Sequence, residues 1–250
     1  MFYNKTMEFT QDILEYYDEL FPVSESQKDF FLRFIKGRNP PPRFLSIGCG
    51  ASNFEHILCR TGCDVTGIDN NHLLLESANR RRKIPGTTIR FFNMAIIEMA
   101  RYLGAGFYSV IYCINNRIAA IHDITLMRKF FFDCKVLLQE GGSLILQLPN
   151  YLVYSEEPVC KLPENQSIRA KLCAKIFTSP SGEKTLLQQI ETSNGKLVSV
   201  VDHEAIVTIK PEEIRELAKE AGFKNVEFFS NYNMESFNPE TSQNILCVLS

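Results

Sequence analysis

The stretch from Phe44 to Asp69 limits the possible folds of this chain more than any other part of the sequence. Residues 44–47 form a short apolar run, and Gly48-Cys49-Gly50 follows it directly. A helical pattern of apolar residues comes next, and a second apolar run over residues 65–68 ends in Asp69. The order of strand, glycine turn, helix, strand and acid predicts an α/β sheet.

The residue types in this stretch indicate a bound nucleoside. Glycines are needed where the backbone turns sharply into a helix and passes close to a ligand. An acid about 20 residues further on, as Asp69 is here, can accept hydrogen bonds from ribose hydroxyls. A dinucleotide site would have a third glycine at Asn53, where it lets the helix pack under a pyrophosphate. The sequence therefore predicts a nucleoside-bearing cofactor without a pyrophosphate. The alternative is a tight strand-to-helix turn without a ligand.

Composition narrows the class of protein. The chain has 250 residues, 45% of them hydrophobic and 22% charged, which is typical of one soluble globular domain or a domain with an insert. Its net charge of −2 disfavours a strongly electrostatic nucleic-acid binder, which would usually be basic. The one basic cluster, at residues 80–83, ends a predicted helix, where cations complement the helix dipole. We interpret it as a solvated helix end rather than a phosphate-binding patch.

The spacing of the cysteines predicts no metal site. The 8 cysteines form no Cys-x-x-Cys pair, and no further ligands accompany Cys59 and Cys63, which can share a helix face. Most cysteines lie in apolar patterns, so we expect reduced thiols and a cytoplasmic protein. The residues after Met1 lack the apolar segment of a signal peptide, and no run approaches the ~18 apolar residues of a membrane span.

Apolar runs that alternate with helical patterns predict a parallel sheet covered by helices on both faces. Strands are expected near residues 43–47, 64–68, 87–92, 107–113 and 143–148. Helices are expected over residues 8–20, 25–37 and 120–138. Ser24 is the expected N-cap of the second helix, because Gln27 follows it three residues later.

The last part of the chain completes the predicted sheet. A helix begins after Lys210, with Pro211 in its first turn, and ends at Gly222. Two strands near residues 225–229 and 244–249 are expected to form an antiparallel hairpin at the sheet edge. The predicted fold class is therefore α/β, a Rossmann-like, doubly wound sheet of seven mostly parallel strands, with the last strand antiparallel.

The alternation of strands and helices stops near Pro149, where a different pattern begins. Three β-like runs follow, at about residues 171–178, 185–192 and 197–209, and Asn194-Gly195 between the last two is a strong hairpin signal. We therefore expect a small antiparallel β insert over the mouth of the main sheet. The expected divisions are an N-terminal helical lid (1–42), a cofactor-binding core (43–150), the insert (151–209) and the C-terminal part of the core sheet (210–250).

Two stretches carry a resemblance to a known family. Residues 44–53, Phe-Leu-Ser-Ile-Gly-Cys-Gly-Ala-Ser-Asn, resemble motif I of class I S-adenosylmethionine (SAM) dependent methyltransferases. Residues 16–22, Tyr-Tyr-Asp-Glu-Leu-Phe-Pro, resemble the opening of small-molecule members such as the glycine/sarcosine N-methyltransferase-like group. The resemblance covers nearly the whole chain. It implies SAM as cofactor and a small molecule as methyl acceptor.

The resemblance also implies which residues bind the cofactor. Residues 67–71 match the family pattern Gly-(Ile/Val)-Asp-x-Ser, so Asp69 would hold the ribose and Asn70 would lie beside the adenosine. Tyr17 would lie near the methionine end, and the amides of the glycine turn would bind the amino-acid tail. The full implied set is Tyr17, Gly48, Cys49, Gly50, Asp69, Asn70, Met94, Ala95, Ile114 and Asn115.

Four positions depart from the family pattern. Ser46 and Met94 stand where the family usually has acids, and Asn115 stands where it has a glycine. Arg117 replaces a serine in the loop after the fourth strand. Arg117 either salt-bridges an acidic substrate or pairs on the surface with Glu98 or Asp123. These departures motivate one alternative, a SAM-binding module that has lost catalysis.

The remaining candidates would face the methyl acceptor. Asn116 and Arg117 lie in a loop at the carboxyl end of a strand, where such sheets bind ligands. Asn150 and Tyr151 match a Gln-x-x-Asn-Tyr pattern of many relatives, in which both face the substrate pocket. His203 in the insert and His122 are possible general bases.

The preferred hypothesis is a methyltransferase that modifies an N or O atom of a small molecule. A methyltransferase of RNA or protein is a further alternative, which the acidic net charge disfavours. The sequence indicates neither the acceptor nor the oligomeric state.

Overall fold

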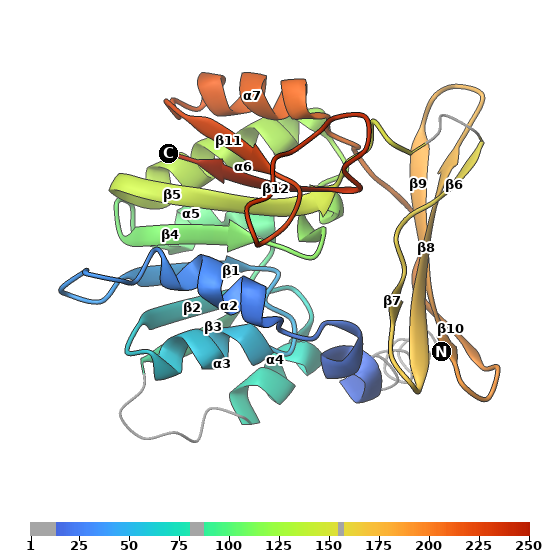
Figure 1. Cartoon of the computed structure of the whole chain (residues 1–250), viewed down its shortest axis with the longest axis horizontal. Helices are drawn as coiled ribbons and strands as arrows, with labels where there is room; N and C mark the ends of the chain where they lie inside the picture. Colours follow the sequence, from blue (N-terminus) through green and yellow to red (C-terminus); the bar gives the residue numbers. More distant parts are fainter. Residues whose placement is uncertain (1–13, 81–87, 155–157) are drawn as a thin grey trace.

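The larger unit of the protein is a seven-stranded sheet. The computed structural model describes residues 14–80, 88–154 and 158–250. The strand order is β11-β12-β5-β4-β1-β2-β3, and all pairings are parallel except those of β12 (Figure 1). The strands are β1 (Arg43–Ile47), β2 (Asp64–Asp69), β3 (Ile89–Asn93), β4 (Tyr108–Cys113), β5 (Leu138–Pro149), β11 (Val226–Phe229) and β12 (Asn244–Leu249). The predicted fold class is confirmed, including the antiparallel hairpin at the sheet edge.

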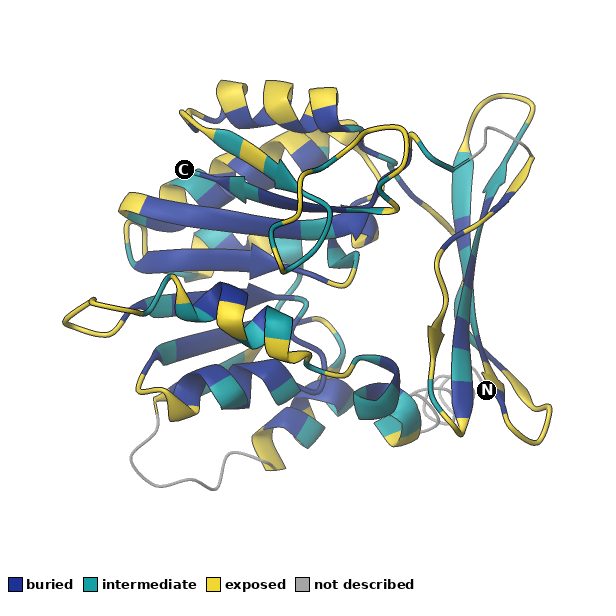
Figure 2. Cartoon of the chain, in the orientation of Figure 1, coloured by how far each residue is buried: buried dark blue, intermediate teal, exposed yellow. Residues whose placement is uncertain are grey.

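Helices cover both faces of this sheet. α2 and α3 bury phenylalanines and Leu58 against one face, whereas α5, α6 and α7 pack on the other. α4 lies beside α3, where His56 Nε2 is 3.1 Å from the Ala78 carbonyl oxygen. Figure 2 shows the strands buried and the helices exposed on their outer sides. The helices are α2 (Glu25–Leu32), α3 (Asn53–Arg60), α4 (His72–Arg80), α5 (Met99–Tyr102), α6 (Ile124–Leu137) and α7 (Pro211–Glu220), with short 3-10 helices η1 (Ile96–Glu98) and η2 (Arg117–Ala120).

Local hydrogen bonds explain where two helices differ from the prediction. Ser24 caps α2 as expected, but the helix ends at Leu32 because the chain tightens into successive three-residue turns up to Gly37. The helix predicted over residues 120–138 begins only at Ile124. There Asp123 accepts hydrogen bonds from two backbone amides and so fixes the N-terminus of α6. The helix predicted over residues 8–20 is described from residue 14 onward, and its first part lies outside the described residues.

A second, antiparallel sheet forms the insert. Its order is β10-β9-β8-β6, and the two-residue β7 pairs with β8. The hairpin at Asn194-Gly195 joins β9 and β10 as predicted, whereas the short β6 and β7 were not predicted. The last run ends at Ala205 rather than 209. The strands are β6 (Val159–Lys161), β7 (Asn165–Gln166), β8 (Ala170–Thr178), β9 (Lys184–Thr192) and β10 (Leu197–Ala205).

The small sheet stands at the carboxyl ends of the core strands (Figure 1). β8 alternates strictly, so that Leu172, Ala174 and Ile176 are buried while Lys171 and Lys175 on the other face are partly exposed. The N-terminal helix (residues 14–20) fills the space between this sheet and the glycine turn, because Tyr17 and Leu20 share a cluster with Leu172. The fold therefore encloses the carboxyl edge of the main sheet from two sides.

Candidate active site

The glycine turn and Asp69 form one rigid unit. Gly48 and Gly50 adopt φ of +72° and +55°, which side chains rarely tolerate. The Asp69 carboxylate, at the end of β2, accepts a 2.9 Å hydrogen bond from the Gly50 amide through Oδ2. Its Oδ1 accepts another, also 2.9 Å, from the Asn71 amide. The loop after β1 and the loop after β2 are thus joined by a single buried carboxylate.

Two side chains lie directly on the glycine turn. A Cβ on Gly50 would lie 1.8 Å from the Tyr17 hydroxyl, and a Cβ on Gly48 would lie 2.8 Å from Arg117 Cβ and Cγ. Arg117 Nη2 donates a 2.9 Å hydrogen bond to the Tyr17 hydroxyl, which joins the N-terminal helix to the loop after β4. Burial raises the pKa of Tyr17, so the phenol stays neutral. The Tyr17 oxygen and Asp69 raise the pKa of Arg117, which keeps its charge.

A cavity of about 180 Å³ opens beside Asp69. Asp69 and Asn70 form one side of it, and Met94 and Ala95 after β3 form another. A carboxylate for vicinal hydroxyls and an apolar slot for a flat ring are what an adenosyl group requires. The other lining residues are Gly48, Ile96, Ile97, Arg117, Ala120, Ile121, His122 and Leu126. Five residues that the resemblance implied as cofactor contacts, with Gly48 among them, therefore meet at one cavity.

A smaller hollow of about 30 Å³ adjoins the glycine turn on its other side. Tyr17, Cys49, Ile114 and Asn115 line it together with Gly48. Burial raises the pKa of the Cys49 thiol well above its ordinary value, so this cysteine is not an ionised nucleophile. Four of the remaining implied cofactor contacts thus line this hollow, whereas Gly50, which donates to Asp69, is not among its described lining residues.

Sequence reasoning missed Glu55, which also lines the hollow. Glu55 is buried on α3 and accepts hydrogen bonds from the Ser46 hydroxyl (2.6 Å) and the Tyr112 hydroxyl (2.9 Å), both through Oε1. Burial raises the pKa of Glu55. The signal was in the sequence: Ser46 stands where the family has an acid, and a glutamate follows in the first turn of the next helix.

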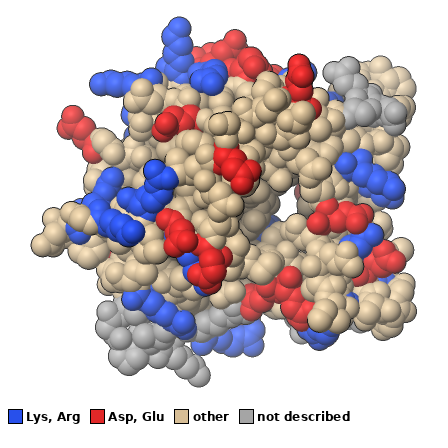
Figure 3. All heavy atoms as spheres, viewed as in Figure 1, with Lys and Arg blue, Asp and Glu red and all other residues tan. Residues whose placement is uncertain are grey.

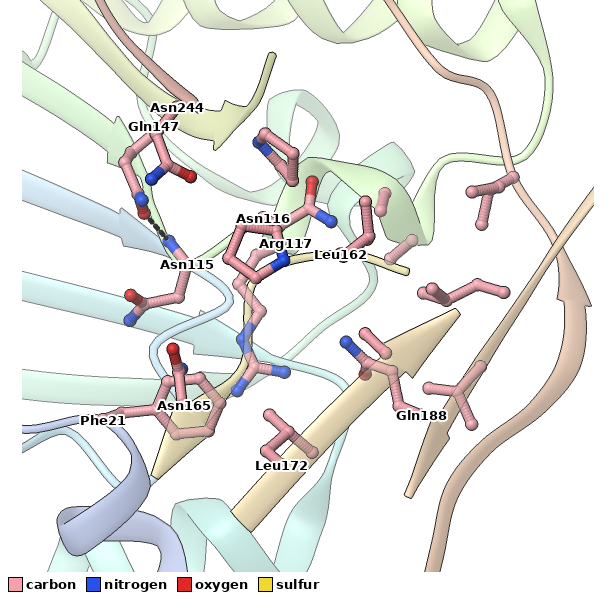
Figure 4. A pocket seen from close by; sticks show the side chains of 18 of the residues that line it. Phe21, Asn115, Asn116, Arg117, Gln147, Leu162, Asn165, Leu172, Gln188 and Asn244 are labelled. Atoms are coloured by element: carbon pink, nitrogen blue, oxygen red, sulfur yellow. Dashed lines mark hydrogen bonds between the residues drawn. The ribbon is translucent and has the colours of Figure 1, made fainter. Parts of the chain in front are cut away.

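A third cavity, of about 260 Å³, lies between the main sheet and the small sheet. The loop after β4 supplies Asn115, Asn116 and Arg117, whose side chains project into it (Figure 4). Amides from other elements add to its polar lining, namely Gln147, Asn165, Gln188 and Asn244. The small sheet and the segments that flank it supply an apolar wall of Leu162, Leu172, Ala174, Leu186, Val201 and Ile206. Arg117 lines both this cavity and the one beside Asp69.

Other candidates for acceptor contacts occupy different places. Tyr151 is buried and donates a 3.2 Å hydrogen bond to Asn116 Oδ1, so it orients Asn116 without lining the cavity. Burial raises the pKa of Tyr151 to about 12. Asn150 is fully buried and donates to the carbonyls of Pro239 and Ser242, so it fixes the loop before β12 rather than facing the cavity.

The histidine and arginine candidates also differ in position. His203 is exposed on β10, beside Thr185 and the Phe177 ring, and is not among the lining residues of the acceptor cavity. His122 lines the cavity beside Asp69 instead. Arg117 forms no ion pair with Glu98 or Asp123 among the described residues. Its side chain is thus directed to the site and not to the surface.

The described residues contain neither a metal-binding cluster nor a membrane-spanning helix. No group of three or more His, Cys, Asp and Glu side chains is arranged to hold a metal ion there. Within the same residues, no helix has the length and apolar character needed to cross a membrane.

Comparison with known proteins identifies the family. A family model described as a methyltransferase domain matches residues 22–228, most of the chain. This chain belongs to that methyltransferase family. A Geobacillus sp. (strain WCH70) protein named as a candidate methyltransferase is 21% identical over 242 residues, covering 93% of this chain and 96% of its own.

Solved structures resemble this methyltransferase along nearly its whole length. A SAM-dependent methyltransferase from Clostridium acetobutylicum has a TM-score of 0.75 and 16% identity, with 96% of this chain and 98% of that chain covered. SAM-bound CalS10, an amino pentose methyltransferase from Micromonospora echinaspora, has a TM-score of 0.59 and 14% identity, with 95% and 96% covered. The family match and these structures support SAM as the cofactor.

Proposed function

We propose that this methyltransferase transfers a methyl group from SAM to a nitrogen or oxygen atom of a small molecule. One observation carries the proposal: the cavity beside Asp69 and the cavity under the small sheet share Arg117 as a wall. A donor in the first cavity and an acceptor in the second would therefore meet next to the loop after β4. Holding two reactants in this way is worth up to roughly 7–11 kcal/mol of the reaction barrier.

The residues of the first cavity and the hollow fit SAM. Asp69 keeps lone pairs for the ribose hydroxyls after accepting from the Gly50 and Asn71 amides. Met94 and Ala95 would pack on the adenine, and the glycine turn would carry the amino-acid tail. Glu55 faces the hollow at this tail end, where its carboxylate would bind the ammonium group. The bound cofactor supplies a methyl group on positively charged sulfur, which a lone pair of the acceptor takes, leaving S-adenosylhomocysteine (SAH).

The chain itself contributes positioning and the exclusion of water. The small sheet and Phe21 of the N-terminal segment cover the acceptor cavity, which supports the proposed role of residues 1–42 as a lid and of the insert as a cover. A neutral amine acceptor needs no base beyond solvent, whereas a hydroxyl acceptor needs one within hydrogen-bond reach. Among the described residues that line this cavity, Glu204 is the one carboxylate.

The covered cavity favours a small acceptor over RNA or protein. Figure 3 shows Lys and Arg interspersed with Asp and Glu on the visible face, beside the opening between the main sheet and the small sheet. Such mixed charge is unlike the basic stripe of nucleic-acid binders. Of the basic cluster at residues 80–83, only Arg80 lies within the described residues. The CalS10 neighbour methylates an amino pentose, a small molecule. Membership of the glycine/sarcosine-like group and a cytoplasmic location stay proposals from the sequence.

Calorimetry with SAM and SAH tests the cofactor site, and SAH release with a panel of small amines and hydroxy compounds tests turnover. Saturable binding together with turnover of one acceptor is the expected result. Failure of both SAM and SAH to bind at millimolar concentration would overturn the proposal. Binding without turnover of any acceptor, including RNA and protein, would favour a binding module that has lost catalysis.

A further inference from the structure

Arg117 lines the acceptor cavity and has a hydrogen-bond donor without a partner. Its Nη2 binds Tyr17, but its Nε is inaccessible to solvent and has no partner in the described part of the chain. No carboxylate forms an ion pair with it among those residues. Figure 4 shows the guanidinium directed into the cavity, between Phe21, Leu172 and Gln188. A planar guanidinium with free donors in a partly apolar pocket is suited to a carboxylate.

No described carboxylate pairs with the charge of Arg117, although Glu204 lines the same cavity. The hydrogen-bond partner of Arg117, Tyr17, is a neutral phenol, because burial raises the pKa of that hydroxyl. Asp69 lines one cavity together with Arg117 and raises its pKa, but the two form no ion pair, and Asp69 already accepts from two backbone amides. Arg117 is partly buried, and a cation with limited access to water is costly unless it is paired. SAM would add a positively charged sulfur near the same side chain, which increases the need for a negative group.

We propose that the methyl acceptor is a carboxylic acid with an apolar body, and that Arg117 is the residue that binds its carboxylate. This inference rests on the proposed function and names the substrate class of that site. The apolar wall, which includes Leu172 and Leu186, would hold the body of the acid, and Asn116 and Gln188 would bind its polar substituents. Tyr17 and Tyr151 hold Arg117 and Asn116 in place for this contact.

The competing ligand for Arg117 is the carboxylate of SAM itself. Arg117 lies next to Gly48, but it is not among the described residues that line the hollow on the other side of the glycine turn, where the proposal above places the amino-acid tail. It lines the acceptor cavity and the cavity beside Asp69. The location therefore favours an acceptor carboxylate, and binding of SAH to Arg117 variants separates the two ligands.

The test uses benzoate, 3-phenylpropionate and hexanoate, each compared with its primary amide. Calorimetry measures their binding to the full chain saturated with SAH, for wild type and for the Arg117→Gln, Arg117→Lys and Arg128→Gln variants. Arg128 is a matched control, because it pairs with Glu220 on the surface. We expect at least one acid to bind wild type about tenfold or more tightly than its amide. Arg117→Gln should abolish that preference, Arg117→Lys should keep part of it, and Arg128→Gln should keep all of it.

Other results would overturn this role of Arg117 or the proposed function. No preference for any acid in wild type loaded with SAH would overturn the inference while leaving the proposed function standing. An acid preference that persists in Arg117→Gln would also overturn it. Loss of SAH affinity in Arg117→Gln, with the melting temperature unchanged, would assign Arg117 to the cofactor. Failure of wild type to bind SAH would instead refute the proposed function, and the inference with it.

Discussion

Ser46 donates a 2.6 Å hydrogen bond to the buried carboxyl group of Glu55, which connects the end of strand β1 to the first turn of α3. The resemblance places an acid at position 46 in related chains. In this protein a serine stands on the strand and the acid comes from the neighbouring helix. A carboxyl group thus lies at the hollow beside the glycine turn, where we propose the amino-acid end of the cofactor, although its position in the sequence has changed. The loss of the acid at Ser46 is therefore a relocation rather than a loss of the group.

The stability of the Glu55→Gln variant should depend less on pH than that of wild type. Burial raises the pKa of Glu55, so the folded state holds this proton more tightly than the unfolded chain does. The stability that the folded state gains from this proton is complete below pH 4.5, which is about the ordinary pKa of a glutamate. It is lost as pH rises through the pKa of Glu55 in the folded state. Each tenfold change in proton affinity is worth about 1.4 kcal/mol. Urea unfolding of wild type and Glu55→Gln from pH 5 to pH 8 measures the difference.

The same glutamate should give SAM binding a pH dependence. If Glu55 binds the ammonium group, its carboxylate form is required, so SAM affinity should rise with pH as this proton is released. Glu55→Gln should bind SAM at least about tenfold more weakly and without that dependence. Glu220→Gln, which changes an exposed glutamate paired with Arg128, is the control. Equal SAM affinity of wild type and Glu55→Gln across the pH range would contradict this role.

The Asp69→Asn variant should lose cofactor affinity. Hydrogen bonds to a charged group are worth about 1.5–3 kcal/mol each, so weakening the ribose contacts should raise the dissociation constant of SAH about ten- to a hundredfold. Asp64→Asn is the matched control, because Asp64 begins the same strand at the opposite end, paired with Arg90. An unchanged dissociation constant for Asp69→Asn would remove the basis of the proposed cofactor site.

The sequence predicted the fold because periodicity and glycine turns are local signals. The continuous apolar runs of the core strands and the Asn194-Gly195 hairpin each specify their own structure over a few residues. The boundaries that differ depend on contacts between neighbouring residues, such as the Asp123 cap that delays α6. The short β6 and β7 exist by pairing with β8, which a pattern within their own residues cannot show.

The site was predictable only where a motif fixes the backbone. Asp69 and the glycine turn meet because consecutive parallel strands end at the same edge. The roles of Asn150 and Glu55 depend on tertiary contacts. Asn150 bonds to Pro239 and Ser242, some 90 residues away, and Glu55 bonds to Tyr112. His203 lies in the predicted insert, but it is exposed, and no sequence pattern indicated this.

The Gly50→Ala variant should displace the N-terminal helix from the site. The new Cβ would lie 1.8 Å from the Tyr17 hydroxyl and 2.4 Å from Tyr17 Cζ, so the ring has to move. Gly106→Ala is the control, because Gly106 has a similar φ of +63° with no atom near its Cβ position. Both variants should lose about 1–2 kcal/mol from backbone strain. Only Gly50→Ala should speed proteolysis near residues 14–24 and weaken SAH binding, and similar proteolysis of both would contradict the contact.

The Arg169→Gln variant should loosen the N-terminal helix without unfolding the protein. Arg169 precedes β8 and donates hydrogen bonds to Glu19 (2.8 Å) and Glu15 (3.2 Å), which tie the small sheet to this helix. All three side chains are solvent-exposed or partly so, and such ion pairs add little to global stability. Hydrogen exchange in residues 14–20 should therefore be faster in the variant than in wild type, while the melting temperature barely changes. Added salt should speed the same exchange in wild type, because it screens the ion pairs.

The control is Arg128→Gln, which breaks an equally exposed ion pair with Glu220 elsewhere and should leave exchange in residues 14–20 unchanged. Equal exchange in wild type and Arg169→Gln would show that apolar packing alone holds the helix.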